Sequence, residues 1–281
     1  MVRILFIGDI VGRPGRDLVR RGLASLIEHH SIDLVIANVE NAAAGFGVTR
    51  EIGDQILDCG VDVMTSGNHV FDRKEALAYV GAEPRILRPA NYPSGAPGRG
   101  RYLARTRLSQ PVGVVNLMGR VFMACLDDPF AVGLREIEAL REQTRIVIVD
   151  FHAEATSEKI AMGWHLDGRA TAVIGTHTHV QTADERILPR GTAFLTDVGM
   201  TGPHDSIVGV EIDAALGRFL TAMPARLETA SGNPRLHAAV VDADEQSGLA
   251  IDIRRLSVGL DDLAQQGQPS DERSVRSAVR G

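Results

Sequence analysis

The chain has 281 residues, of which 44 % are hydrophobic and only 4 % aromatic, so aliphatic side chains must fill its core. Such a composition favours buried parallel strands over an aromatic-rich β-sandwich. The formal net charge of −6 argues against a protein whose main task is to bind long nucleic acid, because such proteins carry a basic face.

The sequence gives no sign of a membrane or an oxidising compartment. The N-terminal apolar run is short and reaches Asp9 before any small-residue cleavage site appears. No run approaches the ~18 apolar residues that a membrane helix needs. Cys59 and Cys125 stand outside any CxxC motif and are predicted to be reduced, buried packing residues. We therefore expect a soluble, cytoplasmic protein.

Short apolar runs alternate with amphipathic stretches, which is typical of an α/β domain. In chain order, the first half predicts a strand at 3–10, a helix at 16–30, a strand at 33–39, a helix at 49–59, a strand at 61–65, a helix at 72–80, a short extended run at 86–89 and a loop at 91–100. The second half predicts a strand at 112–117, a helix at 134–141, and strands at 145–151, 170–176 and 192–196. These elements indicate one layered domain.

Local signals support several of these elements. The first helix places Leu18, Val19, Leu23, Leu26 and Ile27 on one face. Thr49 is a suitable N-cap for the second helix. Residues 236–242 and 249–254 flank a turn and predict an antiparallel hairpin at a sheet edge. The chain becomes polar from residue 261, so we expect a domain at 1–260 and a poorly ordered tail at 261–281.

Five predicted strands each end in side chains that can bind a metal ion. These residues are Asp9, Glu40 with Asn41, Asn68, His152, and His177 with His179. In a parallel α/β sheet the carboxyl ends of the strands lie on one edge, where functional sites form. Five separate segments are therefore expected to deliver their side chains to one place.

These donors suit a pair of metal ions. Two carboxylates, two amides and three imidazoles, without a thiolate, suit Fe, Mn, Zn, Co or Ni. Seven residues exceed what one ion needs, and a carboxylate can bridge two ions about 3.5–4 Å apart. A hydroxide that bridges the ions would then be a nucleophile near neutral pH. The set predicts metal-dependent hydrolysis of a phosphate ester.

Each residue alone also has a purely structural explanation. Asp9 suits a turn or a cap, residues 67–69 suit a turn, and His177 and His179 suit one face of a strand. The order and convergence of the whole set favour the functional interpretation. The pair Gly12 and Gly15 lacks the Lys-Ser/Thr of a P-loop and is interpreted as a tight turn.

Ordered motifs carry a resemblance to a known family. GDIVG at 8–12, VEN at 39–41, GNH at 67–69, DFHAE at 150–154 and GTHTH at 175–179 resemble the five motifs of the calcineurin-like metallophosphoesterases. Longer segments, among them LRPANYP, DFHAEATSEK and TDVGMTGP, are similar to the YmdB-like branch, from residue 2 to about 256. The resemblance implies an α/β sandwich of two packed mixed sheets flanked by helices. It also implies a phosphodiesterase that acts on 2′,3′- or 3′,5′-cyclic nucleotides, with iron as a metal.

The first motif departs from the wider superfamily, because its usual Asp-x-His here reads Asp9-Ile10-Val11. We expect Asn41 to supply the missing ligand; its harder oxygen favours iron or manganese, with zinc also compatible. The predicted first metal site is formed by Asp9, Glu40, Asn41 and His179. The predicted second site is formed by Glu40, Asn68, His152 and His177, so that Glu40 bridges. His69 is the predicted general acid.

Two other functions remain open from the sequence: a phosphomonoesterase with the same metals, and a regulatory RNA- or protein-binding protein with a relic site. Two divalent ions would bring four positive charges, and Asp9, Glu40 and the bridging hydroxide would neutralise three of them. About one positive charge would then be left for the substrate. No dense cluster of Arg or Lys is expected beside the motifs, so a singly charged diester fits better. Loops 43–47 and 199–202 are the expected pocket walls, with His204 as a further candidate. The expected partner is a small cyclic phosphodiester, and a homo-oligomer is left open.

Overall fold

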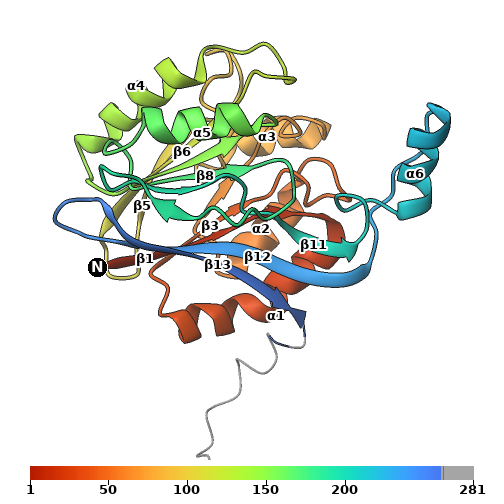
Figure 1. Cartoon of the computed structure of the whole chain (residues 1–281), viewed down its shortest axis with the longest axis horizontal. Helices are drawn as coiled ribbons and strands as arrows, with labels where there is room; N and C mark the ends of the chain where they lie inside the picture. Colours follow the sequence, from red (N-terminus) through yellow and green to blue (C-terminus); the bar gives the residue numbers. More distant parts are fainter. Residues whose placement is uncertain (261, 263–281) are drawn as a thin grey trace, which may run out of the picture.

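Two mixed β-sheets pack face to face, and helices cover their outer faces, in the computed structural model of the chain (Figure 1). The structure describes residues 1–260 and 262. The predicted fold class, an α/β sandwich of two mixed sheets flanked by helices, is confirmed. The tail predicted at 261–281 lies outside the described residues, apart from residue 262. No helix in the described part has the length and apolarity to cross a membrane.

The first sheet has the strand order β2-β11-β12-β1-β3-β4, with β13 paired to β12. Its strands are β1 (Val2–Ile7), β2 (Asp9–Ile10), β3 (Leu34–Asn38), β4 (Val63–Thr65), β11 (Met200–Asp205), β12 (Gly232–Ala243) and β13 (Ala250–Gly259). Strands β1, β3 and β4 are parallel, whereas β12 runs antiparallel to β1 and β13. The predicted hairpin is therefore confirmed, with β13 at the edge.

The second sheet has the order β5-β6-β7-β8-β10-β9. Its strands are β5 (Arg101–Arg105), β6 (Pro111–Met118), β7 (Val147–His152), β8 (Ala172–Thr176), β9 (Arg186–Ile187) and β10 (Ala193–Leu195). The four central strands are parallel, and the two outer strands pair antiparallel to them. The carboxyl ends of β7 and β8 consequently lie on the same edge.

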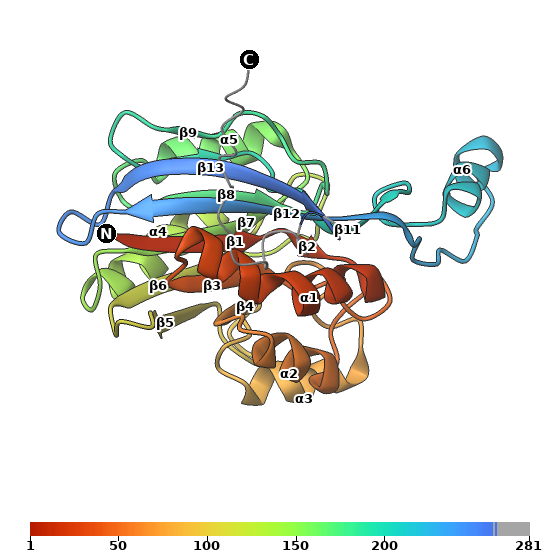
Figure 2. The ribbon, with the colours of Figure 1, turned by 90° about the horizontal axis from the view of Figure 1, so that it is seen from below.

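Helices from the first third of the chain cover the first sheet, as Figure 2 shows. These are α1 (Gly12–His30), α2 (Arg50–Asp58) and α3 (Lys74–Ala82). The second sheet is covered by α4 (Pro129–Arg141) and α5 (Thr156–His165). The last helix, α6 (Ile212–Thr221), stands away from the body in both views and exposes Phe219 and Leu220.

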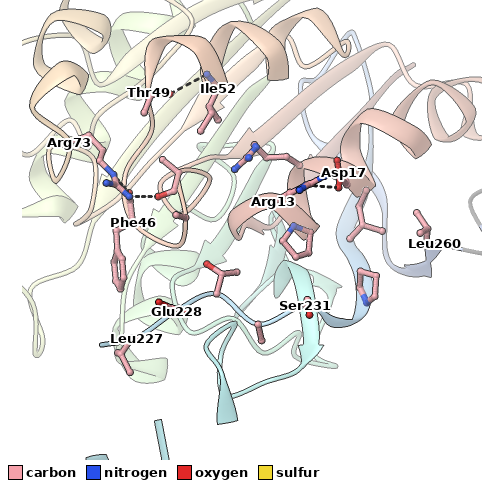
Figure 3. Close-up of a pocket in the computed structure, with 18 of the residues that line it drawn as sticks. Arg13, Asp17, Phe46, Thr49, Ile52, Arg73, Leu227, Glu228, Ser231 and Leu260 are labelled. Carbon is pink, nitrogen blue, oxygen red and sulfur yellow. Dashed lines mark hydrogen bonds and ion pairs between the residues drawn. The ribbon is translucent and has the colours of Figure 1, made fainter. Parts of the chain in front are cut away.

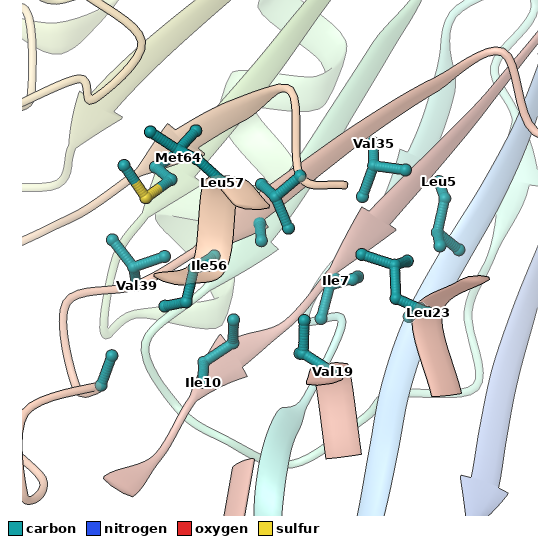
Figure 4. Packing of buried hydrophobic residues seen from close by; sticks show 14 of the residues in the cluster. Leu5, Ile7, Ile10, Val19, Leu23, Val35, Val39, Ile56, Leu57 and Met64 are labelled. Atoms are coloured by element: carbon teal, nitrogen blue, oxygen red, sulfur yellow. The ribbon is translucent and has the colours of Figure 1, made fainter. Parts of the chain in front are cut away.

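Strand β1 shows how side-chain alternation fills both sides of a sheet. Ile4 and Phe6 belong to the core between the sheets, whereas Leu5 and Ile7 pack toward the helices. Figure 4 shows Val19 and Leu23 of α1 against this outer face. Because both faces are buried, the strand reads as a continuous apolar run. The predicted apolar face of α1 is fully buried, which confirms that prediction.

The N-terminal region differs from the prediction at three glycines. The strand predicted at 3–10 is interrupted at Gly8, where a Cβ atom would lie 1.9 Å from the Gly199 carbonyl oxygen. Gly12 and Gly15 open α1 rather than forming a tight turn, so that interpretation was wrong. A Cβ on Gly15 would lie 2.2 Å from the Thr201 carbonyl oxygen. Gly8 and Gly15 thus allow residues 199–201 to approach the motif that carries Asp9.

Several elements were not predicted from the sequence. Strands β5, β9 and β11 and helices α5 and α6 are among them. Helix α5 buries the charged residues Glu158 and Lys159, which a hydrophobic periodicity counts as solvent-facing. Thr49 caps α2 as predicted, with its side chain accepting the Ile52 N–H at 3.3 Å. Cys59 packs partly against the core, but Cys125 is exposed, so its prediction as a packing residue was wrong.

Candidate active site

The strand ends of both sheets meet at one pocket, named here the catalytic pocket, of about 420 Å³. Glu40, Asn41, His177 and His179 line it. Asp9 and His152 are fully buried, and both contact these lining residues. The structure therefore brings side chains at the carboxyl ends of β1, β3, β7 and β8 to one place.

One group of candidate ligands surrounds His152, the last residue of β7. Its Nε2 lies 3.1 Å from Glu40 Oε1 and 2.9 Å from Asn68 Oδ1. The ring of His177 lies 4.6 Å from that of His152, measured between centroids. Ligand atoms of Glu40, His152 and His177 lie within 4.8 Å of one another, which is a spacing suited to one metal ion.

The hydrogen bonds behind His152 determine which of its nitrogens faces this group. The Thr176 hydroxyl donates to Asp150 Oδ1 at 2.7 Å, so it accepts the Nδ1–H of His152 at 3.0 Å. The Nε2 lone pair then points at the oxygens of Glu40 and Asn68. That arrangement is repulsive unless a proton or a metal cation lies between them.

The pKa values of His152 and Glu40 also indicate that a cation is favoured between these two side chains. Burial opposes the charged form of His152, but neighbouring Glu40, helped by Asp9 and Asp150, raises the pKa of His152 to about 9. Burial also opposes ionisation of Glu40, yet His152 and the N–H of His69 together lower the pKa of Glu40 to about 2. Burial raises the pKa of Asp150 to about 7, against the effect of His152.

A second group surrounds Asp9 at the start of β2. Asp9 Oδ1 lies 3.9 Å from His179 Nε2, is buried, and has no hydrogen-bond partner. Burial raises the pKa of Asp9, although His179 and His152 oppose this. The Nδ2 atom of Asn41 lies 3.2 Å from His179 Nε2 and donates to Glu40 Oε1 at 3.4 Å. An unpaired buried carboxylate oxygen is costly, so this group also fits a cation.

The loop with His177 and His179 has an uncommon backbone that buried contacts hold in place. Both histidines have positive φ, 96° and 65°, a region that costs non-glycine residues free energy. Asp197 accepts the N–H of the intervening Thr178 at 3.1 Å, and Lys159 donates to Asp197 at 2.6 Å. Sequence reasoning missed Lys159 and Asp197, because a buried ion pair between distant segments leaves no local pattern.

Gly67 allows the loop after β4 to approach His152. A Cβ atom on Gly67 would lie 2.1 Å from Cδ2 of the His152 ring. The absence of a side chain thus lets Asn68, the next residue, reach the His152 Nε2 atom. The glycine that looked like a turn residue in the sequence is required by this close approach.

His69 lies at the rim of the catalytic pocket, beside the candidate ligands. Its backbone N–H donates to Glu40 Oε2 at 3.1 Å, and its Nδ1 lies 2.7 Å from Asp72 Oδ2. The ring of Phe46 packs against it at 5.1 Å between centroids. With Nδ1 held by Asp72, the Nε2 atom is available to a ligand in the pocket.

The pocket walls differ in part from the prediction. Ala44, Gly45 and Phe46 line the pocket as expected, whereas no residue of 199–202 does. The other walls are formed by Val208–Val210 and Leu227–Thr229, which follow β11 and precede β12. His204 does not line the pocket but packs on His237, with ring centroids 4.4 Å apart.

Glu154 is a pocket residue that sequence reasoning missed. Its Oε2 atom lies 3.2 Å from His177 Nε2. It stands two residues after His152 in the DFHAE motif, so its position in the motif was the available signal. Burial, with the charge of His152, nevertheless lowers the pKa of His177 to about 3, which keeps that imidazole neutral and suited to bind a metal.

A sandwich of two sheets with carboxylate, amide and imidazole donors at their common edge defines a metallophosphoesterase. The chain belongs to the YmdB-like family, whose model matches residues 5–256. The predicted resemblance is thereby confirmed.

Named relatives and solved structures agree with this family. The chain is 46 % identical over 262 residues to a 2′,3′-cyclic-nucleotide 2′-phosphodiesterase of Bacillus subtilis, covering 93 % of this chain and 99 % of the relative. A hypothetical protein from Thermus thermophilus has a TM-score of 0.85 at 43 % identity, covering 92 % of this chain and 99 % of the other. A novel phosphatase from Mycoplasma pneumoniae has a TM-score of 0.86 at 31 % identity, covering 92 % and 93 %.

Proposed function

We propose that the protein is a phosphodiesterase that hydrolyses cyclic nucleotides with the aid of two metal ions. The observation that carries this proposal is the position of Glu40 between the two candidate ligand groups. It lies 3.1 Å from His152 in one group and 3.4 Å from the Asn41 amide in the other. The Bacillus subtilis relative, named for activity on 2′,3′-cyclic nucleotides, supports the substrate class.

The donor set fits the proposed ions. Asp9, Glu40, Asn41 and His179 would hold the first ion, and Glu40, Asn68, His152 and His177 the second. Oxygen and imidazole donors without thiolates favour iron or manganese over a thiolate-type zinc site. Bound ions would activate water and neutralise the charge that develops on the phosphoryl oxygens. The cytoplasmic location and homo-oligomer remain predictions.

His69 is the group proposed to protonate the leaving oxygen. Asp72 Oδ2 lies 2.7 Å from its Nδ1 atom and orients the ring, which lines the catalytic pocket. The backbone N–H of His69 donates to Glu40. The general acid is therefore held at a fixed place relative to the proposed bridging carboxylate.

The charge beside the catalytic pocket differs from the prediction. No dense arginine cluster was expected beside the motifs, but five arginines line a pocket that adjoins the catalytic pocket. This positive charge favours anions with more than one charge and keeps a phosphomonoesterase as the second candidate. The diester proposal then rests on the family relative and on the general acid, since an alkoxide leaving group needs a proton.

The test compares kcat/KM on 2′,3′-cyclic AMP, 3′,5′-cyclic AMP, a nitrophenyl diester and nitrophenyl phosphate under one manganese condition. We expect a cyclic nucleotide to be the best substrate, and protein treated with a chelator to be inactive until manganese is restored. If the monoester is preferred by tenfold or more, the phosphomonoesterase replaces the diesterase. Activity that survives complete removal of metal would contradict both.

A further inference from the structure

A second, larger pocket of about 1170 Å³ lies beside the catalytic pocket and is named here the arginine pocket. Arginines line it from three parts of the chain: Arg13, Arg16, Arg21, Arg73 and Arg226. Two carboxylates, Asp17 and Glu228, are among its lining residues, so its net formal charge is +3. Figure 3 shows Arg13 and Arg73 on opposite sides of this pocket. The charge is unusual in a chain whose net charge is −6.

Two of these arginines build the wall between the pockets. Arg73 donates to the carbonyl oxygens of Phe46 at 2.9 Å and Ala43 at 2.6 Å. Arg16 donates to the carbonyl oxygen of Ala42. A carbonyl oxygen carries no formal charge, so both guanidinium groups keep their positive charge beside the wall. Their field therefore acts on any ligand that enters the pocket.

The remaining arginines are available to solvent. Arg13 has a side chain that is 84 % exposed, and its Nε lies 3.6 Å from Asp17 Oδ2. The same carboxylate lies 2.8 Å from Arg20 outside the pocket, so Asp17 is shared between two cations. Arg21 is exposed on the same helix. An anion with several oxygens would offer Arg13 and Arg21 the acceptors that one shared carboxylate cannot.

The two pockets adjoin each other. Both are lined by Ala44, Phe46, Leu227, Glu228 and Thr229. Phe46 lies between them with its ring against His69, and in Figure 3 Leu227 lies near it. An aromatic ring at this place offers a stacking surface for a nucleobase. A ligand that reaches both pockets would thus have one phosphate beside His69, a base near Phe46 and a further anionic group among the arginines.

We propose that the arginine pocket is a subsite for a phosphate on the 5′ oxygen of a 2′,3′-cyclic nucleotide. This inference rests on the proposed function and names its substrate class: cyclic phosphates at the 3′ end of short oligoribonucleotides, or cyclic mononucleotides with a 5′-phosphate. Both carry a phosphoryl group on the 5′ oxygen, which is a singly charged diester in the oligonucleotide and a phosphomonoester in the mononucleotide. Long nucleic acid is not the expected ligand, because the net charge of −6 leaves the rest of the surface acidic on average.

The test measures kcat/KM on three substrates: adenosine 2′,3′-cyclic phosphate, the same compound with a 5′-phosphate, and a dinucleotide that ends in the cyclic phosphate. We expect about tenfold or more in favour of a 5′-phosphorylated substrate, through a lower KM. The double variant Arg13→Gln/Arg21→Gln should reduce this ratio to near one. Arg107→Gln, at an exposed arginine that does not line the arginine pocket, should retain it.

The two phosphorylated substrates distinguish the sources of the phosphate. A gain on either one that the double variant removes supports the subsite and identifies its source. The absence of a gain on both, or a gain that the double variant retains, overturns it. If the wild-type protein does not hydrolyse the unphosphorylated cyclic nucleotide with any metal, the proposed function fails instead.

A binding measurement tests whether the proposed subsite exists, even if no substrate is hydrolysed. Calorimetry on the manganese-loaded protein compares adenosine 3′,5′-bisphosphate with adenosine 3′-monophosphate. We expect the bisphosphate to bind about tenfold more tightly, and the advantage to disappear in the Arg13→Gln/Arg21→Gln protein. Equal affinity of the wild-type protein for both ligands would overturn the proposal.

Discussion

The catalytic pocket and the arginine pocket share a wall but are built in different ways. In the catalytic pocket the candidate ligands extend from strand ends of two sheets, and Asp9, Glu40 and His152 are buried. In the arginine pocket the charges come from one helix and two loop segments, and the Arg13 side chain is 84 % exposed. Buried contacts hold donor atoms against one another, whereas exposed arginines can adapt to a ligand.

We therefore expect the catalytic pocket to carry out the reaction and the arginine pocket to determine which substrate is preferred. Removing one buried donor is expected to disable the reaction on every substrate. Removing an exposed arginine is expected to change which substrate is preferred. Substitutions in the catalytic pocket test this comparison, beginning with the residue common to both ligand groups.

The largest effect is expected for Glu40→Gln. The substitution keeps the side-chain volume but removes the charge that both ligand groups share, so activity should fall by about 10⁴-fold or more. Metal content should fall with it, because each ion would lose an anionic ligand. The measurement is kcat together with metal analysis of the purified protein, with Glu138→Gln on the exposed side of α4 as the control. Full metal occupancy in the Glu40 variant would show that this residue does not bridge.

A smaller loss is expected for His69→Ala. A general acid contributes about 10²–10⁴-fold, or about 3–5 kcal/mol of transition-state stabilisation. The loss should shrink on a nitrophenyl diester, whose leaving group needs no proton, and metal content should stay near that of the wild type. His29→Ala, at the exposed end of α1, is the matched control. An equal loss on good and poor leaving groups would contradict the role of His69.

The smallest effect is a pH dependence that should be confined to metal-free protein. There His152 has a pKa of about 9, above its ordinary value of 6.5. The stabilisation that protonated His152 adds to the free energy of unfolding is therefore fully present below pH 6.5 and is lost as the pH rises through 9. The loss is about 3 kcal/mol. Manganese-loaded protein, with Nε2 bound to the ion, should not show this loss in urea unfolding between these pH values. The same slope in both forms would mean that His152 is not a ligand.

The sequence predicted the catalytic pocket better than its surroundings for a physical reason. Each candidate ligand follows a buried strand, and an apolar run that ends in Asp9, Glu40 or His152 is visible in a single sequence. The common edge of the strands then brings these residues together without further information. The α/β class was predictable on the same grounds, because strands buried on both faces read as continuous apolar runs.

The arginine pocket was not predictable, because it depends on contacts between distant segments. No dense cluster of Arg or Lys was expected beside the motifs, because nothing local in the sequence shows that residues 226–231 return to α1. The break at Gly8 was missed for a similar reason, since it is imposed by the approach of Gly199. The Lys159–Asp197 pair that supports the His177 loop also joins segments 38 residues apart.

Metal stoichiometry tests the central claim most directly. The two ligand groups around Asp9 and His152, with Glu40 between them, predict two ions per chain. Protein purified without chelator, reconstituted with manganese or iron and measured by native mass spectrometry should carry two ions per chain, and its activity should follow the occupancy. One ion or fewer per chain, unchanged after reconstitution in a fully active protein, would contradict the account.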